Sequence, residues 1–289
     1  MTDWRTDMQL ASVAAIGVLT LPLLLSGYSG GPLSGPTPET VTITAHDYSF
    51  EAPYWLASGA VTLRLVNKGK EFHHIWLLRI DHGKTAADFI EAMKTAHGKL
   101  PIWARDVGGP NAPAPGGEAN ATIELEPGTY LLACAIASSD GVPHVMKGMV
   151  HTMTVTKGSR RATLPQADVT LMLRDYNFTT SVPLTAGKRV IEVRNYGRQA
   201  HEVELVRLAP GKHAADVLRW IEQPESAPPG MPLGGVSPLA SGGRSQFTVN
   251  LEPGRYAMIC FLPDAADGKP HFMHGMMQEI EVGAELTRN

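Results

Sequence analysis

Soft metal ligands are concentrated in the stretch Tyr256-Ala-Met-Ile-Cys260-Phe-Leu-Pro-Asp-Ala-Ala-Asp-Gly-Lys-Pro-His271-Phe-Met-His-Gly-Met276. A cysteine ends an apolar run, a polar turn follows, and a histidine and then a methionine come after the turn. Thiolate, imidazole and thioether are the ligand types that suit copper. The same arrangement occurs earlier, from Tyr130 to Met149, and the two stretches contain the only cysteines of the chain. The pattern predicts two copies of one metal-binding loop.

The sequence is an internal duplication. Three pairs of segments match at a constant offset of 128 residues: Val41–Phe50 with Val169–Phe178, Gly69–Arg79 with Gly197–Arg207, and Gly83–Asp88 with Gly211–Asp216. After a small insertion or deletion, Glu126–Tyr130 matches Glu252–Tyr256. Because these matches keep their order along the chain, they do not arise by chance and indicate a repeat architecture.

The chain has 289 residues, which is enough for two domains. The repeats predict the following division: residues 1–38 as signal peptide or membrane anchor plus linker, 39–157 as domain 1, 158–167 as linker, 168–283 as domain 2, and 284–289 as a polar tail. Residues 39–157 are called repeat 1 below, and residues 168–283 repeat 2.

The N-terminus carries an apolar run from Met8 to Leu25, followed by small residues and prolines. This order is typical of an export signal. The 18-residue run is also long enough to span a bilayer as an uncleaved anchor. We therefore expect an exported protein, periplasmic or extracellular, that meets the membrane only through this segment. Outside the cytoplasm, two cysteines would by default form a disulfide.

Composition limits the fold classes and the kinds of partner to be expected. The net charge is −3 without a basic block, so no nucleic-acid partner is expected. The 29 glycines and 22 prolines favour many turns. With alternating apolar residues in most segments, they predict an all-β fold of two tandem Greek-key β-sandwiches. Helical spacing predicts one short helical insertion in each repeat, beginning near Thr85 and near His213, followed by Gly/Pro-rich loops at 108–117 and 228–238.

Strand alternation indicates which histidines face a core. In repeat 2, His201 shares its face with Val203 and Leu205, whereas Glu202 and Glu204 share the opposite face. The apolar face must be the core, so His201 is expected to point inward.

The duplication transfers this prediction to repeat 1. His73 shares the corresponding face with Ile75, which selects His73 rather than His74 as the inward histidine. The same alternation places Cys134 and Cys260 on inward faces of their strands. An inward histidine and an inward cysteine on neighbouring strands could meet, with the loop after the cysteine folded over them.

The order histidine, cysteine, loop, histidine and methionine resembles the cupredoxins, the blue-copper Greek-key sandwiches, over residues 39–283. The gap between cysteine and second histidine, nine residues in repeat 1 and ten in repeat 2, looks most like the type 1 copper loop of copper nitrite reductases. The resemblance implies two copper sites. Their ligands would be His73, Cys134, His144 and Met149 in one, and His201, Cys260, His271 and Met276 in the other.

The resemblance implies single-electron transfer through copper, with a redox partner protein that the sequence does not identify. Copper nitrite reductases and laccases place a histidine beside the type 1 cysteine, in order to reach a second copper centre. The neighbours here are Ala133, Ala135, Ile259 and Phe261. We therefore expect no type 2 or trinuclear copper site and no enzyme. Trimers are known among proteins of this kind, so a homo-oligomer is one expectation.

Alternatives stay open at this stage. The methionine and histidine surplus near the loops (Met146, Met273, His274 and Met277) also suits a periplasmic copper buffer or chaperone. A third interpretation is a metal-free cupredoxin-like module that binds a partner. Under it, the cysteines would be inert buried thiols or a disulfide, the two loop histidines would cap backbone carbonyls, and the two methionines would pack in the core.

Overall fold

The computed structural model describes residues 36–95, 99–158, 162–224 and 227–283. Most of the predicted signal or anchor segment, and all of the tail 284–289, lie outside the described residues. Within the described part of the chain, no helix is both long enough and apolar enough to cross a membrane.

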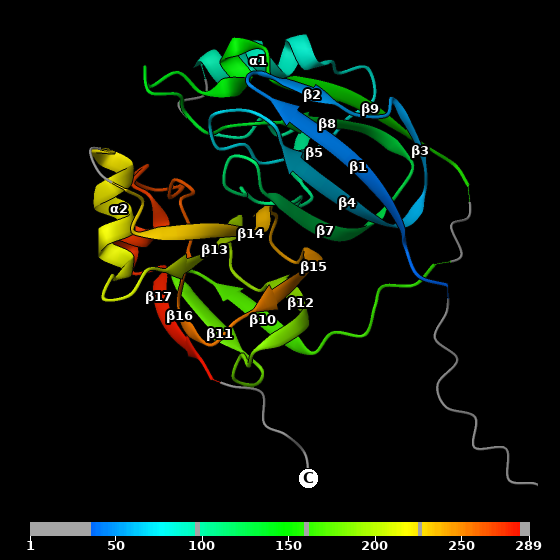
Figure 1. Ribbon diagram of the computed structural model, residues 1–289. Coiled ribbons are helices and arrows are strands. Elements are labelled where there is room, and N and C mark those ends of the chain that lie inside the picture. The colour runs from blue at the N-terminus through cyan, green and yellow to red at the C-terminus, as the bar shows by residue number, and fades with distance from the viewer. Residues whose placement is uncertain (1–35, 96–98, 159–161, 225–226, 284–289) are drawn as a thin grey trace, which may run out of the picture. The chain divides into compact units, whose positions relative to one another are not determined.

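The described residues form an all-β fold with a few short helices, as predicted (Figure 1). The strands of repeat 1 are β1 (Glu39–His46), β2 (Ser49–Glu51), β3 (Trp55–Ala57), β4 (Gly59–Asn67), β5 (Trp76–Ile80), β6 (Ala104–Asp106), β7 (Glu118–Leu125), β8 (Gly128–Ala133) and β9 (Val150–Thr156). Those of repeat 2 are β10 (Val169–Arg174), β11 (Asn177–Thr180), β12 (Gly187–Asn195), β13 (His201–Leu208), β14 (Gly230–Leu239), β15 (Arg244–Leu251), β16 (Gly254–Ile259) and β17 (Met277–Val282).

The strands form three sheets. One sheet passes from repeat 2 into repeat 1 in the order β11-β10-β12-β15-β7-β4-β1-β2, and its two halves meet where Gln246 pairs with Thr122. A second sheet, β3-β9-β8-β5-β6, lies in repeat 1, and a third, β14-β13-β16-β17, lies in repeat 2. Each repeat is therefore a two-sheet sandwich. The domain boundaries given above remain a prediction.

Each sandwich encloses its own core. Alternate residues of β1 (Val41, Ile43 and Ala45) are buried with residues of the facing sheet. The core of repeat 1 contains Cys134 and Met149, and that of repeat 2 contains Cys260 and Met276. The cysteine-bearing stretches therefore begin inside the two cores.

The two predicted helices are present as α1 (Ala86–Thr95) and α2 (Ala214–Glu222). They cover the outer faces of β5 and β13 with separate apolar clusters, and in Figure 1 α2 lies against the sheet that contains β13. Phe89 of α1 is buried with its ring centroid 5.5 Å from that of Trp76. Ile221, which the helical spacing assigns to the apolar face of α2, is instead 51% exposed.

One predicted loop is a strand. Most of the Gly/Pro-rich segment 228–238 belongs to β14, which pairs with β13 at the edge of its sheet. An edge strand tolerates proline because one side of its backbone carries no continuous ladder of hydrogen bonds. At Gly235 (φ +144), a Cβ would come 2.1 Å from the carbonyl oxygen of Val203, so the close pairing requires glycine.

The residues after β6 lie alongside β14. Val107, Pro110 and Pro113 of repeat 1 make isolated bridges to Leu239, Val236 and Leu233 of repeat 2. The predicted loop 108–117 is therefore a contact between the repeats. Its course brings Asn111 close to β13.

The tyrosine that follows each Glu-Pro-Gly turn makes a hydrogen bond like that of the tyrosine corners in other β-sandwiches. Tyr130 donates its hydroxyl hydrogen to the carbonyl oxygen of Glu126 at 2.9 Å, and Tyr256 donates to that of Glu252 at 2.8 Å.

Candidate metal centres

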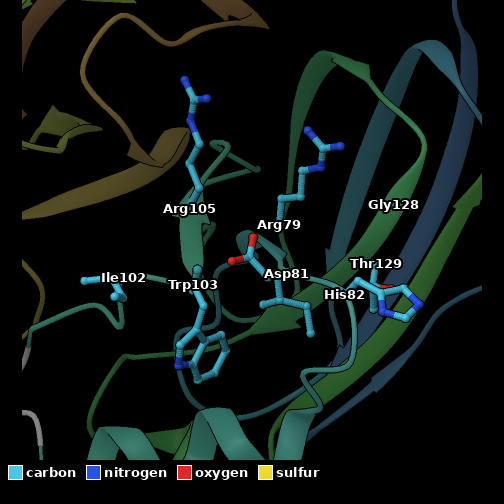
Figure 2. Close-up of a pocket in the computed structure, with 10 residues that line it drawn as sticks. Arg79, Asp81, His82, Ile102, Trp103, Arg105, Gly128 and Thr129 are labelled. Atoms are coloured by element: carbon cyan, nitrogen blue, oxygen red, sulfur yellow. The ribbon is translucent and has the colours of Figure 1, made fainter.

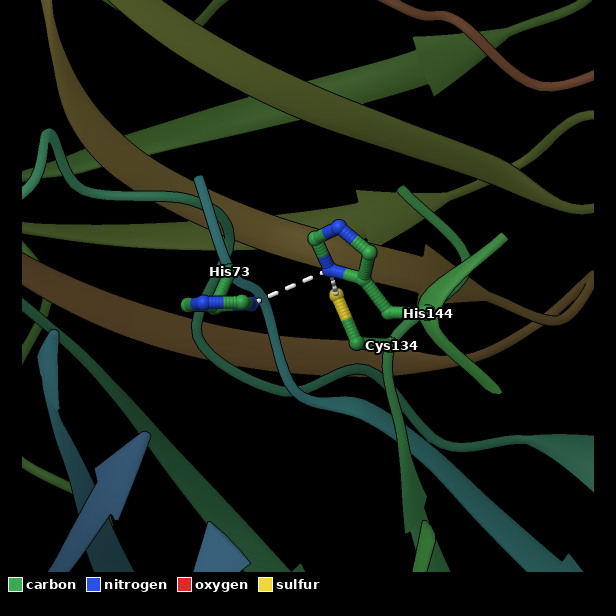
Figure 3. Close-up of side chains that lie close together, drawn as sticks. All are labelled: His73, Cys134 and His144. Atoms are coloured by element: carbon green, nitrogen blue, oxygen red, sulfur yellow. Dashed lines mark hydrogen bonds between the residues drawn. The ribbon is translucent and has the colours of Figure 1, made fainter. Parts of the chain in front are cut away.

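Each repeat brings three of its four predicted ligands together. The ligand atoms of His73, Cys134 and His144 lie within 4.8 Å of one another (site 1, Figure 3). Those of His201, Cys260 and His271 do the same (site 2). All six side chains are fully buried. The alternation argument therefore selected the histidine that reaches the cysteine in each repeat.

The two sites have nearly the same geometry. In site 1, Nδ1 of His144 lies 3.1 Å from Nδ1 of His73 and 3.4 Å from Sγ of Cys134. The dashed lines in Figure 3 mark these two contacts. In site 2, the corresponding distances from His271 are 3.0 Å to Nδ1 of His201 and 3.3 Å to Sγ of Cys260. In both sites, two ring nitrogens and one sulfur face a common point.

A short 3-10 turn sets the spacing between the second histidine and the methionine. The turn η1 (His144–Lys147) ends at Gly148, whose φ of 100° lies in the left-handed region that favours glycine. Met149 then donates its N–H to the carbonyl of His144 at 3.0 Å. Repeat 2 builds the same turn from η2 (His271–His274), Gly275 at φ 103° and Met276.

The methionines lie beside the cysteines in the backbone pairing. The N–H of Cys134 donates to the carbonyl of Met149 at 3.3 Å, and that of Cys260 donates to the carbonyl of Met276 at 3.1 Å. Both methionines are fully buried in the same core cluster as their cysteine. Both methionines therefore pack in the core of their repeat, next to the backbone of the cysteine.

A carboxylate orients the first histidine of each site. Nε2 of His73 lies 3.0 Å from Oδ1 of Asp47, and Nε2 of His201 lies 2.9 Å from Oδ1 of Asp175. An imidazole that donates Nε2–H to a carboxylate presents the lone pair of Nδ1 to the site. Burial lowers the pKa of both histidines, and the carboxylate hydrogen bond offsets only part of this effect. Both rings are therefore neutral near pH 7, as metal ligation requires.

The second histidine of site 1 also contacts a carboxylate. Nε2 of His144 lies 2.7 Å from Oε2 of Glu71, and Oε1 of Glu71 accepts the hydroxyl hydrogen of Tyr48 at 3.0 Å. The Tyr48 ring lies edge-on to the His144 ring, at a centroid distance of 5.3 Å.

Site 2 differs at this point. Gln199 occupies the position of Glu71, and the carboxylate comes from Asp264, whose Oδ2 lies 3.9 Å from Nε2 of His271. Asp264 accepts hydrogen bonds from Tyr176 at 2.6 Å and from Gln199 at 2.7 Å. Nε2 of His271 has no hydrogen-bond partner among the described residues. Burial lowers the pKa of His271 to about 4.

Both cysteines are free thiols in separate cores, so the disulfide alternative is wrong. Burial raises the pKa of Cys134 to about 12 and also raises that of Cys260. Each thiol is therefore protonated near neutral pH, and a metal ion that binds it must displace the proton. A cysteine thiolate, two imidazoles and a methionine thioether are donor types that suit copper, so copper is the cofactor that these residues fit.

The face of β13 opposite the core is also buried, which the alternation does not reveal. Glu202 and Glu204 are 4% and 6% exposed, because Asn111 and Ala112 of repeat 1 cover them. Burial raises the pKa of Glu202 to about 7. His74 likewise faces away from the site but is 6% exposed.

A separate cavity of about 540 Å³ lies in repeat 1 (Figure 2). Its lining includes Arg79, Asp81, His82, Trp103 and Arg105 and none of the eight predicted ligands. It is therefore distinct from both candidate metal centres.

Two β-sandwiches, each with a buried His–Cys–His group joined by a 3-10 turn to a buried methionine, make a cupredoxin-like fold. No family model matches the sequence, and no curated protein matches it closely enough to count as a relative.

Several solved structures are similar. One is dithionite-reduced auracyanin from Roseiflexus castenholzii, at 21% identity and a TM-score of 0.28, over 42% of this chain and 99% of that chain. Another is a blue copper oxidase from Nitrosomonas europaea, at 16% identity and a TM-score of 0.26, over 86% of each chain. A third is a copper-containing nitrite reductase from Thermus scotoductus SA-01, at 11% identity and a TM-score of 0.24, over 85% of this chain and 62% of that chain. The second and third of these proteins are enzymes.

Proposed function

We propose that this protein is an exported copper protein that transfers single electrons through one type 1-like site in each repeat. The proposed ligands are His73, Cys134, His144 and Met149 in site 1, and His201, Cys260, His271 and Met276 in site 2. The observation that carries the proposal is the agreement between the two copies. Two diverged repeats place the same three donor types at the same separations, within 0.1 Å for both distances compared above.

The protein residues supply a rigid and dry setting for electron transfer. Copper held by a thiolate and two imidazoles supplies a one-electron couple between Cu(I) and Cu(II). Asp47 and Asp175 hold His73 and His201 in one tautomer. The 3-10 turns that end at Gly148 and Gly275 fix the positions of the second histidines, His144 and His271. All six side chains are buried, so few groups need to move when the charge of the site changes.

Electron transfer is favoured over catalysis by the residues beside the cysteines. Ala133, Ala135, Ile259 and Phe261 offer no ligand for a second, catalytic copper. An anaerobic reductive titration of the copper-loaded protein tests this proposal. We expect uptake of one electron per copper, full reoxidation by a one-electron acceptor, and no turnover of oxygen or nitrite. Sustained consumption of either substrate, abolished by Cys134→Ser with Cys260→Ser, would contradict it.

Copper storage is a second candidate, and one observation favours it. Ligand atoms of Asp264, Asp267 and His274 lie within 4.8 Å of one another beside site 2. At the equivalent place in repeat 1, Lys147 forms an ion pair with Asp140 at 2.8 Å. Storage predicts more than one copper ion in repeat 2, lost on His274→Ala. Electron transfer predicts one copper ion per repeat. If the protein binds no copper at all, both copper functions are wrong and the metal-free partner-binding module is the alternative that stands.

Export is part of the proposal and rests on the apolar run from Met8 to Leu25. Fractionation of producing cells with N-terminal sequencing of the recovered protein tests it. A cleaved periplasmic form or an uncleaved membrane-bound form agrees with export, whereas full-length protein confined to the cytoplasm contradicts it.

A further inference from the structure

His74 and Glu202 occupy equivalent positions in the two repeats, 128 residues apart, and make equivalent hydrogen bonds. The N–H of Ala135, the residue after Cys134, donates to Nε2 of His74 at 3.0 Å. The N–H of Phe261, the residue after Cys260, donates to Oε1 of Glu202 at 3.1 Å. In each repeat, the side chain of the residue after the first proposed histidine ligand therefore contacts the backbone next to the proposed cysteine ligand.

Asn111 connects these two side chains. Its Oδ1 lies 3.4 Å from Nδ1 of His74, and its Nδ2 donates to Oε2 of Glu202 at 3.4 Å. Because Nε2 of His74 accepts the Ala135 N–H, Nδ1 carries the ring hydrogen and donates to Asn111. Asn111 is fixed by further bonds, since its Oδ1 accepts the N–H of Ala112 at 3.0 Å and its Nδ2 also donates to the carbonyl of Val203 at 3.2 Å.

The result is a continuous chain of hydrogen bonds between the two cysteine-bearing segments: Ala135, His74, Asn111, Glu202, Phe261. The three side chains are 3–6% exposed, so the chain is shielded from water. Electronic coupling falls less steeply through covalent and hydrogen-bonded contacts than across a van der Waals gap. Buried hydrogen-bond networks also polarise one another strongly in a low dielectric. Both ends join the backbone at the same place relative to the cysteine.

We propose that this hydrogen-bond chain couples the two sites, so that an electron delivered to either site exchanges with the other inside the molecule. The inference rests on the proposed copper function. One site loses one electron and the other gains it. Every hydrogen bond in the chain keeps its proton, so the exchange needs no co-reactant.

Asn111→Leu interrupts the chain, and Ser237→Ala is a matched control. Ser237 is also buried between the repeats, where it accepts the N–H of Gly109 and donates to the carbonyl of Ile75, both at 2.7 Å. It is not a member of the chain. If Asn111→Leu does not fold, Asn111→Ser replaces it, because serine is too short to reach both His74 and Glu202.

The rate of electron exchange is measured by flash photoreduction of the copper-loaded protein with less than one electron per molecule. Cys134→Ser and Cys260→Ser identify beforehand the wavelengths at which the two sites differ. We expect a first-order redistribution phase independent of protein concentration, slowed at least tenfold by the Asn111 variant and unchanged by Ser237→Ala. A phase that scales with protein concentration, or equal rates in wild type and the Asn111 variant, would overturn the inference.

A second readout uses the metal-free protein. Amide hydrogen exchange at Ala135 and Phe261 should accelerate in the Asn111 variant and not in Ser237→Ala, because the side chains that accept these N–H groups lose their support. Unchanged protection at both amides would show that Asn111 does not maintain the chain, and would overturn the inference. Failure to bind copper at either site refutes the proposed function instead, so the two failures are distinguishable.

Discussion

Oδ1 of Asp47 lies 3.0 Å from Nε2 of His73, and the backbone of Gly69 passes directly beside this pair. A Cβ at Gly69 would come 2.3 Å from the carboxylate oxygen and 2.5 Å from the ring nitrogen. Repeat 2 has the same arrangement, in which a Cβ at Gly197 would come 2.5 Å from Nε2 of His201. The orientation of the first histidine therefore depends on a glycine that does not touch the metal position.

Gly69→Ala should weaken copper binding at site 1 by roughly 10-fold to 100-fold, the usual effect of losing a partner that orients a metal ligand. Site 2 should keep its affinity. Competition titrations on Cys260→Ser and Cys134→Ser backgrounds measure each site separately. Gly283→Ala is the control, since a Cβ there meets nothing within 4 Å. Unchanged affinity of site 1 in Gly69→Ala would contradict the role given to the Asp47–His73 pair.

Glu71→Gln should raise the reduction potential of site 1. The Glu71 carboxylate lies 2.7 Å from Nε2 of His144. It makes the imidazole a stronger electron-pair donor to copper, and this stabilises Cu(II) relative to Cu(I). Gln199 stands at the equivalent position in repeat 2, so the variant makes site 1 resemble site 2. Redox titration of wild type should show two transitions, with site 1 the lower, and the variant should bring them closer. A single indistinguishable transition in wild type would contradict this prediction.

Met149→Leu and Met276→Leu distinguish an axial ligand from core packing. The swap nearly conserves volume, so the free energy of unfolding of the metal-free protein should fall by less than about 1.5 kcal/mol. If the thioether is a weak axial ligand, its loss should leave copper bound and raise the potential of that site. Potentials equal to those of the wild type would assign both methionines to packing alone.

Asp106→Asn should remove a pH dependence of stability. Asp106 is buried and accepts the Nε1–H of Trp76 at 2.7 Å. Burial raises the pKa of Asp106 from 3.8 to about 6, although the Trp76 hydrogen bond opposes the rise. Between these values the unfolded chain has lost the proton that the folded chain keeps. Stability from this group is therefore full below pH 4 and lost by about pH 6.

The magnitude follows from the shift in pKa. The free energy of unfolding of the metal-free wild type should fall by on the order of 3 kcal/mol relative to Asp106→Asn between pH 4 and pH 6.5. Denaturant titrations at several pH values measure the difference. Parallel curves for the two proteins would show that Asp106 does not titrate in this window.

Much of the fold could be predicted because the duplication contains each segment twice, so that the pattern in one repeat could be compared with the pattern in the other. The helical insertions near Thr85 and His213 were predicted where the structure has α1 and α2. The segment 228–238 was not, because its glycines and prolines are typical of loops. The segment forms the edge strand β14 only because it pairs with β13. This pairing is a long-range contact, which the local sequence pattern does not encode.

The same limit applies to the sites. Alternation with Val203 and Leu205 selected His201, and the duplication transferred that choice to His73. Asp47 and Asp175 were visible as matched positions, but only the folded chain shows that their carboxylates meet the histidines. Asn111 carried no signal, because its role arises where the two repeats touch.

The most direct test of the central claim is addition of copper to the metal-free protein, followed by its visible absorption. The account predicts two copper ions per chain and an intense band from thiolate-to-copper charge transfer. Cys134→Ser and Cys260→Ser should each remove one ion and part of the band, and the double variant should remove all of it. A protein that binds no copper, or a band that survives in the double variant, would contradict the account.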